Sequence, residues 1–187
     1  MVADWSERHA VARDQLLNFL SERLKIALRE REIRHDLIDA VFSLGGEDDL
    51  VRLVARVEAL QAFLKSDDGA NLLAGYRRAV NIVKAEEKKD KTTFDGEPDP
   101  KLLQAPEEIV LFKEMAEARA LIAAELARER FTEAMTVMAR LRGPVDAFFE
   151  KVTVNAPDAK LRQNRLLLLS RLRASLHAVA DFSKIEG

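Results

Sequence analysis

Residues that interrupt helices are scarce in this sequence, and they fall in a few short stretches. Glycine and proline together supply 12 of its 187 residues, which is few for any fold that is rich in turns. Leucine, alanine, arginine and glutamate are frequent, and all four favour helix. The sequence therefore predicts an all-α protein, a helical bundle of about seven or eight helices.

Apolar residues recur at helical spacing in eight segments. In chain order these are about Val11–Arg31, His35–Ser43, Leu50–Leu64, Ala70–Lys89, Pro106–Arg128, Phe131–Leu141, Pro144–Val152 and Ala159–Ala180. Asp48 and Asp49 precede the third segment, where acidic residues favour the positive end of a helix dipole.

The stretch Lys91–Ala105 separates two groups of helices. It contains two prolines, a glycine and no sustained period, so we expect a loop or an ordered connection. Residues 1–90 are then the N-terminal helices, 91–105 the connecting loop and 106–187 the C-terminal helices of one compact unit. The pattern leaves open whether the loop divides two subdomains or crosses the bundle.

Composition excludes several classes of protein. The chain has no cysteine, which excludes disulfides, thiolate catalysis and cysteine-ligated metal sites. Its 30 basic and 32 acidic side chains give a net charge of −2, so a generally cationic nucleic-acid binder is excluded, although a local basic patch is not. The apolar runs are too short to span a membrane, and the first residues lack the apolar core of a signal peptide. We expect a soluble, cytoplasmic protein with no membrane partner.

No catalytic or metal-binding pattern stands out. A Gly-rich phosphate loop, a Gly-x-Ser-x-Gly motif and a dinucleotide-binding fingerprint are all missing. His35 and Asp36 are similar to the His-Asp pairs that ligate metals in one class of phosphohydrolase, but only His9 and His177 remain as further histidines. A surface histidine beside a helix-capping aspartate is the better interpretation. We expect no catalytic residue, no metal and no cofactor bound by this chain.

A local basic patch is expected on the last helix. Five basic residues and no acidic residue occur between Ala159 and Ala180. At 100° per residue, its apolar stripe consists of Leu161, Leu168, Leu172, Leu176 and Val179. The polar residues fall on two flanking faces, one with Lys160, Asn164 and Arg171, the other with Arg162 and Arg173.

Arg165 is the exception on this helix, because its helical angle places it within the apolar stripe. A guanidinium buried there needs an acceptor. We expect a structural role for Arg165, with its side chain inward and paired with an acidic residue from another helix or with backbone carbonyls. The neighbouring Asn164 is expected to point outward.

The predicted helix around Tyr76 carries a second polar row. Arg77, Asn81, Lys84 and Lys88 occupy positions i, i+4, i+7 and i+11, which lie on one face. Such a row is either an ordinary solvated face or a face that binds RNA, where lysine and arginine neutralise phosphates and asparagine reaches a base edge. We expect the row to face solvent and, with the last helix, to border one RNA-facing groove.

Nine stretches of the sequence together resemble a known family. They are Ile33–Val41, Asp49–Val57, Ala59–Leu60, Phe63–Leu64, Leu72–Val83 and, as the most specific, Pro144–Phe149, Val152–Asn155, Leu161–Leu166 and Val179–Ser183. In this order they resemble the C-terminal region of the β subunit of the bacterial two-subunit glycyl-tRNA synthetases. The resemblance covers most of the chain and implies the all-helical DALR anticodon-binding domain that this family shares with arginyl-tRNA synthetases.

The resemblance implies tRNA binding within a glycine–tRNA ligase that uses ATP, glycine and Mg²⁺. In the family, aminoacylation belongs to a separate α subunit and full β subunits are much longer, so it implies a C-terminal fragment that is not catalytic alone. Its partners are then glycine tRNA and, through the full β chain, the α subunit. The residues expected to bind tRNA are Arg77, Arg78, Asn81, Lys84, Lys88, Lys160, Arg162, Asn164 and Arg171. Without the resemblance, the Ala- and Leu-rich bundle and the near-neutral charge favour a helical protein–protein adaptor.

Overall fold

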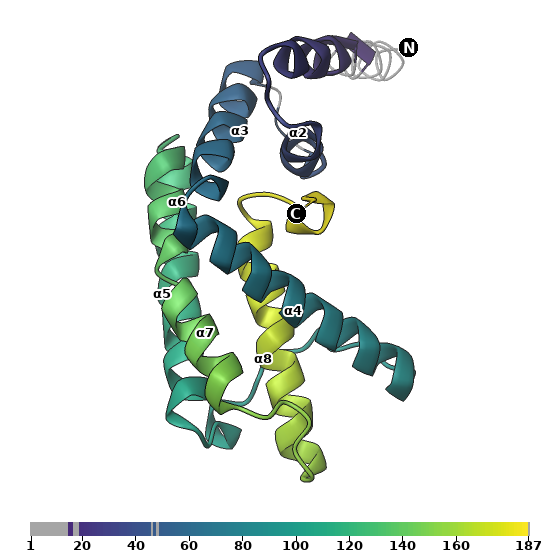
Figure 1. The fold of residues 1–187 in the computed structure, drawn as a ribbon, viewed down its shortest axis with the longest axis vertical. Coiled ribbons are helices and arrows are strands. Elements are labelled where there is room, and N and C mark those ends of the chain that lie inside the picture. The colour runs from purple at the N-terminus through teal and green to yellow at the C-terminus, as the bar shows by residue number, and fades with distance from the viewer. Residues whose placement is uncertain (1–14, 17–18, 46, 48, 187) are drawn as a thin grey trace, which may run out of the picture.

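The computed structural model describes residues 15–16, 19–45, 47 and 49–186. This part of the chain is mostly helical and contains no strand (Figure 1), which confirms the all-α prediction. A helix over residues 19–30 comes first. It is followed by α2 (His35–Phe42), α3 (Leu50–Leu64), α4 (Asp67–Asp90), the 3-10 turn η1 (Pro100–Leu102), α5 (Pro106–Ala127), α6 (Phe131–Ala139), α7 (Arg142–Lys151), α8 (Ala159–His177) and the 3-10 turn η2 (Phe182–Lys184).

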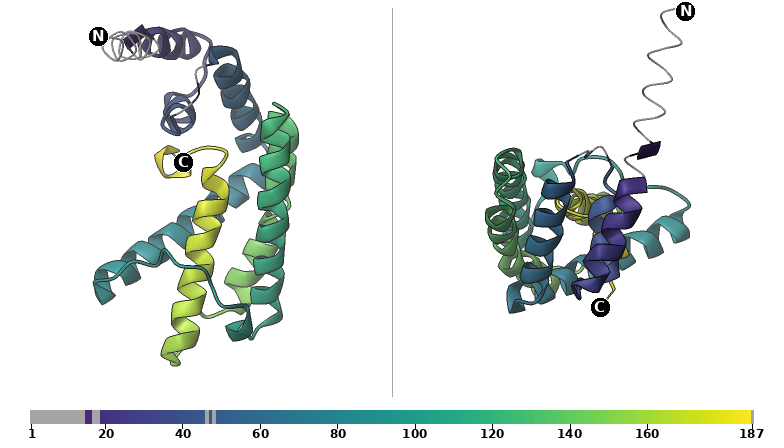
Figure 2. Two further views of the ribbon diagram at one scale, coloured as in Figure 1. Left: turned by 180° about the vertical axis from the view of Figure 1, so that it is seen from behind. Right: turned by 90° about the horizontal axis from the view of Figure 1, so that it is seen from above.

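The helices form an elongated bundle, with α8 between α4 and α5 (Figures 1 and 2). The long helix α4 crosses α8, while α5 packs against α6, α7 and α8. Helix α3 packs against α2, α4 and α6, so helices on both sides of residues 91–105 contact one another. The turn η2 lies against α2 (Figure 1), which places the segment after α8 beside an N-terminal helix.

Several helix starts follow from capping side chains. Asp49 accepts hydrogen bonds from the N–H groups of Val51 and Arg52 at the start of α3. Ser66 accepts one from Gly69, so α4 begins at Asp67 and not at the expected Ala70. These bonds satisfy N–H groups that have no partner within the helix. Residues 11–14, Leu17 and Asp48 lie outside the described residues.

Other helix ends differ from the expectation by a few residues. Helix α7 already begins at Arg142, so Pro144 lies in its first turn, where a missing N–H is tolerated. Helix α8 ends at His177, three residues before the expected Ala180. No helix in the described part of the chain is both long enough and apolar enough to cross a bilayer.

Helix α8 lies at the centre of the hydrophobic core. Five of its leucines have no exposed surface: Leu166, Leu168, Leu169, Leu172 and Leu176. At 100° per residue these positions, together with the buried Asn164 and Ser175, cover much more than one stripe. A helix that is buried on most sides is typical of the centre of a bundle. In contrast, the helix over residues 19–30 buries Leu28 but leaves Phe19 and Ile26 exposed.

The turn between α3 and α4 depends on a glycine. A Cβ atom at Gly69 would lie 2.1 Å from the carbonyl oxygen of Phe63 and 2.7 Å from its carbonyl carbon. These are backbone atoms, so a larger residue forces the two helices apart. A Cβ atom at Gly96, in the connection before α5, would make only an ordinary van der Waals contact, 3.6 Å from Cδ2 of Leu167.

We therefore expect opposite effects from the same substitution at these two glycines. Gly69→Ala should lower the free energy of unfolding by about 1–3 kcal/mol, because the α3–α4 turn must move. Gly96→Ala should raise it by about 0.4–1 kcal/mol, because alanine restricts the unfolded chain and meets no close neighbour in the folded one. Urea unfolding followed by circular dichroism measures both, and equal effects of the two substitutions would contradict this account of the turn.

Candidate nucleic-acid interface

The polar row on α4 is largely exposed, as expected. Asn81, Lys84 and Lys88 are exposed, whereas Arg77 is half-buried and donates a hydrogen bond of 2.9 Å to the carbonyl of Ile185. The expectation of a solvent-facing row is therefore confirmed for three residues and wrong for Arg77. The exposed Arg78 lies beside the row, with its guanidinium 4.4 Å above the ring centre of Phe149 on α7.

A groove of about 440 Å³ lies between α4 and the second half of α8. We call it the α4–α8 groove, and its lining residues are Tyr76, Val80, Lys84, Arg173, Ala174, His177, Asp181 and Ser183. Neither Lys84 nor Arg173 has an ion-pair partner within 4 Å among the described residues. Both cations therefore keep their charge available to an anion in the groove.

Arg173 and His177 are groove residues that the sequence analysis did not assign. They lie one turn apart on α8 and face Lys84 across the groove only because α4 crosses α8 at this level. No local pattern in the sequence indicates that these two helices cross. The signal in the sequence is weak, because the second half of this helix also carries other polar residues, such as Ser170, Arg171 and Ser175.

Both arginines in the first half of α8, Arg162 and Arg165, are bound to acidic residues of other elements. Arg162 forms ion pairs with Glu86 and, at 2.6 Å, with Asp90 at the end of α4, and donates to Asn155. The hydrogen bonds from Arg162 and Asn155 lower the pKa of Glu86. This cluster holds the start of α8 against the end of α4, so Arg162 is largely occupied by protein contacts.

Arg171 is similarly engaged, whereas Lys160 is exposed. The Arg171 guanidinium forms an ion pair with Glu97 in the connection before α5 and lies 4.8 Å above the ring centre of Phe112. Lys160 has no ion-pair partner among the residues that the structure describes. Three of the five basic side chains of α8 are thus balanced by carboxylates.

Asn164 is buried, which corrects the expectation that it points outward and contacts RNA. It is 3% exposed, and its side-chain amide donates to the carbonyl of Asp99 at 3.0 Å and accepts from the N–H of Asp99 at 2.7 Å. The outward assignment assumed a single apolar stripe on α8. Because residues 91–105 cover another face of this helix, Asn164 lies beneath them and binds their backbone.

The inward position of Arg165 and its pairing with an acidic residue are confirmed. Its side chain is 12% exposed, and Nε contacts the carboxylate of Glu108, which has no exposed surface. Nη1 donates to the carbonyl of Thr153 at 2.8 Å. Glu108 also accepts hydrogen bonds from the N–H groups of Gln104 and Ala105 at the start of α5. Arg165 therefore compensates a buried charge that caps a second helix.

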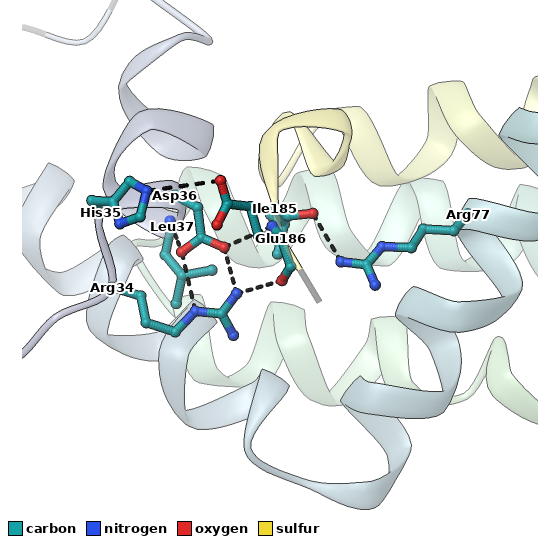
Figure 3. Close-up of polar contacts among 7 residues, drawn as sticks. All are labelled: Arg34, His35, Asp36, Leu37, Arg77, Ile185 and Glu186. Atoms are coloured by element: carbon teal, nitrogen blue, oxygen red, sulfur yellow. Dashed lines mark hydrogen bonds and ion pairs between the residues drawn. The ribbon is translucent and has the colours of Figure 1, made fainter.

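The pair His35 and Asp36 does not act as a unit (Figure 3). The imidazole of His35 is exposed, 3.9 Å from the exposed carboxylate of Glu186. The side chain of Asp36 is 3% exposed and turns toward the end of the chain. It accepts hydrogen bonds from Arg34, from the N–H of Leu37 at 3.0 Å and from the N–H of Glu186 at 2.7 Å.

Residues 72–186 match the DALR anticodon binding domain family. This match covers more than half of the chain. The chain belongs to the DALR anticodon binding domain family. The matched residues include all of the α4–α8 groove, whereas α2 and α3 lie outside the match with this family.

Curated relatives of this DALR chain are named as glycine–tRNA ligase beta subunits. It is 58% identical to the one from Rhodospirillum centenum over 173 residues, which are 92% of this chain and 24% of the relative. It is 53% identical to the one from Phenylobacterium zucineum, with 93% and 26% covered. It is 46% identical to the one from Dinoroseobacter shibae, with 100% and 26% covered. The chain spans about a quarter of the length of these relatives.

Two arginines of α8 should differ sharply in their contribution to the stability of this DALR domain. Arg165→Ala leaves the buried carboxylate of Glu108 without its cation and should lower the free energy of unfolding by about 3–5 kcal/mol. Arg171→Ala removes a pair with an exposed carboxylate and should lower it by only about 1 kcal/mol. Urea unfolding measures both. Similar losses for the two variants would show that the Arg165–Glu108 pair is not critical.

The carboxylate of Asp36 should make stability depend on pH. Burial raises the pKa of Asp36, but the hydrogen bonds from Arg34, Glu186 and Leu37 outweigh burial and lower the pKa. The stabilisation is complete above the ordinary aspartate pKa of about 3.9 and is lost as the pH falls through the lowered value. Between pH 6 and 3, the free energy of unfolding should therefore fall more steeply for the wild type than for Asp36→Asn. Parallel curves would contradict this assignment.

Proposed function

We propose that this chain is a tRNA-binding module of a glycine–tRNA ligase β subunit and that RNA binds in and beside the α4–α8 groove. The observation that carries the proposal is that Lys84 and Arg173, two cations without a carboxylate partner among the described residues, line a groove inside the DALR match. The family match supports RNA binding over the protein-adaptor alternative. The relatives are named glycine–tRNA ligase beta subunits, and these names are the basis for proposing this enzyme and glycine as its amino acid.

The charge distribution favours this groove over the first half of α8. Phosphate groups bind where a lysine or arginine is not already paired, because binding then releases counterions without breaking an ion pair. Arg162, Arg165 and Arg171 are each paired, whereas Lys84 and Arg173 are not. A groove of about 440 Å³ lined by a tyrosine and two cations also suits the unstacked bases of an RNA loop better than a duplex, which proteins recognise mainly by its shape.

The proposed contact residues differ from those expected from sequence. We retain the exposed residues and add one from the groove, which gives Arg78, Asn81, Lys84, Lys88, Lys160 and Arg173. We withdraw Arg162, Asn164 and Arg171, because each binds another element of the fold. Arg77 contacts the segment after α8, through the carbonyl of Ile185.

The proposal also concerns the whole ligase of which this chain would be a part. We propose glycine tRNA as the RNA, the α subunit as the catalytic partner and the cytoplasm as the location. Glycine, ATP and Mg²⁺ then act at sites outside this chain, and the chain alone neither activates glycine nor charges tRNA. Measurable ATP–pyrophosphate exchange by the purified chain would contradict that assignment.

Charge reversal on α4 tests the RNA-binding site. Lys84→Glu and Lys88→Glu should each weaken binding of glycine tRNA at low salt and make the log–log salt dependence shallower by about 1 per lost phosphate contact. The matched control is Arg119→Glu, an exposed position on α5 that contributes nothing to the groove. The measurement is a fluorescence titration at several salt concentrations, with an anticodon-swapped tRNA as competitor.

The outcomes of this titration separate the competing functions. If the wild-type chain shows no saturable tRNA binding, the proposed function fails and the adaptor alternative gains support. If the wild type binds but the α4 variants bind with unchanged affinity and salt dependence, the RNA site lies elsewhere on the domain.

A further inference from the structure

The segment after α8 forms one wall of the α4–α8 groove. We call Asp181–Glu186 the tail segment, and its Asp181 and Ser183 line the groove. Phe182 is buried, and its ring centre lies 5.5 Å from that of Tyr76, a groove residue on α4. The position of the tail segment therefore determines the shape of the groove at this side.

The main chain of the tail segment forms hydrogen bonds with two helices, and the bond with α4 is drawn in Figure 3. The N–H of Asp181 donates to the carbonyl of Ala40 on α2 at 2.9 Å. Further along, Arg77 on α4 donates to the carbonyl of Ile185. These bonds depend on the path of the main chain, so a displaced tail segment loses them together.

Asp36 and Arg34 hold the far end of the tail segment. The Asp36 carboxylate accepts from the N–H of Glu186 at 2.7 Å, and Arg34 donates both to Asp36 and to the carbonyl of Glu186 (Figure 3). We call these two residues the latch. A buried carboxylate that loses such a donor is strongly destabilised, so the latch favours one position of Glu186. Both latch residues lie before residue 72, outside the match to the DALR family.

The tail segment also places a carboxylate, that of Asp181, in the groove. Oδ1 of Asp181 accepts from the N–H of Ser183 at 3.1 Å and from its hydroxyl at 2.6 Å, within the turn η2. Asp181 and Arg173 both line the groove together with Tyr76. Burial and the charge of Asp181 raise the pKa of Tyr76, while Arg173 lowers it. If η2 opens, the Asp181 carboxylate loses these donors and repels phosphate beside Arg173.

We propose that Arg34 and Asp36 are positioning residues for RNA binding, which hold the tail segment as the wall of the α4–α8 groove. The latch residues do not contact RNA themselves and act only through the position of the tail segment. Residues at the start of helix α2, which does not line the groove, therefore affect the affinity of the groove for RNA. This inference rests on the proposed function, because it concerns the same groove.

The test compares two isosteric substitutions on one helix. Asp36→Asn removes the charge of the latch, whereas the matched control, Asp39→Asn, changes a half-exposed carboxylate whose ion pair is with Lys25 at 3.8 Å. Hydrogen–deuterium exchange reports on the tail segment, and titration with glycine tRNA reports on the groove. We expect Asp36→Asn to speed exchange of residues 181–186 and to weaken tRNA binding about 5–10-fold, and Asp39→Asn to do neither.

A second variant keeps the test decisive if Asp36→Asn does not fold. Arg34 has a half-exposed side chain, so Arg34→Met, which has no hydrogen-bond donor, removes the bonds to Asp36 and Glu186 with little risk to the core. It should likewise loosen the tail segment and weaken tRNA binding. Unchanged exchange in both variants, or faster exchange with unchanged tRNA affinity, would overturn the latch.

A double-mutant cycle separates positioning from general destabilisation. Arg173→Gln removes the groove cation that lies near Asp181. If the latch acts through the groove, Asp36→Asn should weaken tRNA binding much less in the Arg173→Gln background than in the wild type. Additive losses would overturn the proposal. If the wild type itself does not bind tRNA, the proposed function fails while the exchange experiment still tests whether the latch holds the tail segment.

Discussion

Helix α8 has five basic side chains and no acidic one, yet five of its leucines are completely buried. A helix of this composition can lie at the centre of a bundle only if other elements supply carboxylates for its inward-facing arginines. Helix α4 supplies Glu86 and Asp90, α5 supplies Glu108, and the connection between these helices supplies Glu97. The ion pairs are directional, so they fix how α4, α5 and the connection lie around α8.

These ion pairs determine which basic side chains are left unpaired and can bind an anionic ligand. The basic residues that looked like one patch in the sequence divide into a paired group and an unpaired group once the fold is known. Lys84 and Arg173 belong to the unpaired group and come from different helices that meet at the groove. A chain with a net charge of −2 can therefore present a small cationic surface without being basic as a whole.

Sequence reasoning succeeded where the cause of a structure is local. Scarce glycines and prolines, apolar spacing and the acidic residue Asp49 before α3 predicted the helices to within a few residues. Arg165 was predicted correctly because a guanidinium within an apolar stripe needs a partner, whatever that partner is. Asn164 was assigned wrongly, because a single-stripe picture holds for a surface helix and α8 is covered on several sides.

The groove and the latch could not be predicted, because their partners are distant in sequence. Asp36 was considered together with its neighbour His35, but its distinctive partner is the N–H of Glu186, 150 residues further along. Nothing near Asp36 in the chain indicates that contact. The same holds for Arg173, which faces Lys84 only through the crossing of α4 and α8.

The reciprocal hydrogen bonds between Asn164 and Asp99 have a consequence for how the chain folds during synthesis. Residues 91–105 leave the ribosome well before α8, yet the side chain that satisfies the backbone at Asp99 lies 65 residues later. The partners of Glu86 and Glu97 in α8 are 76 and 74 residues later. Contacts of such long separation slow folding relative to a bundle with local contacts. Helices α4 and α5 therefore cannot reach their final arrangement until residues 159–177 have been made, and until then their acidic groups stay exposed to water.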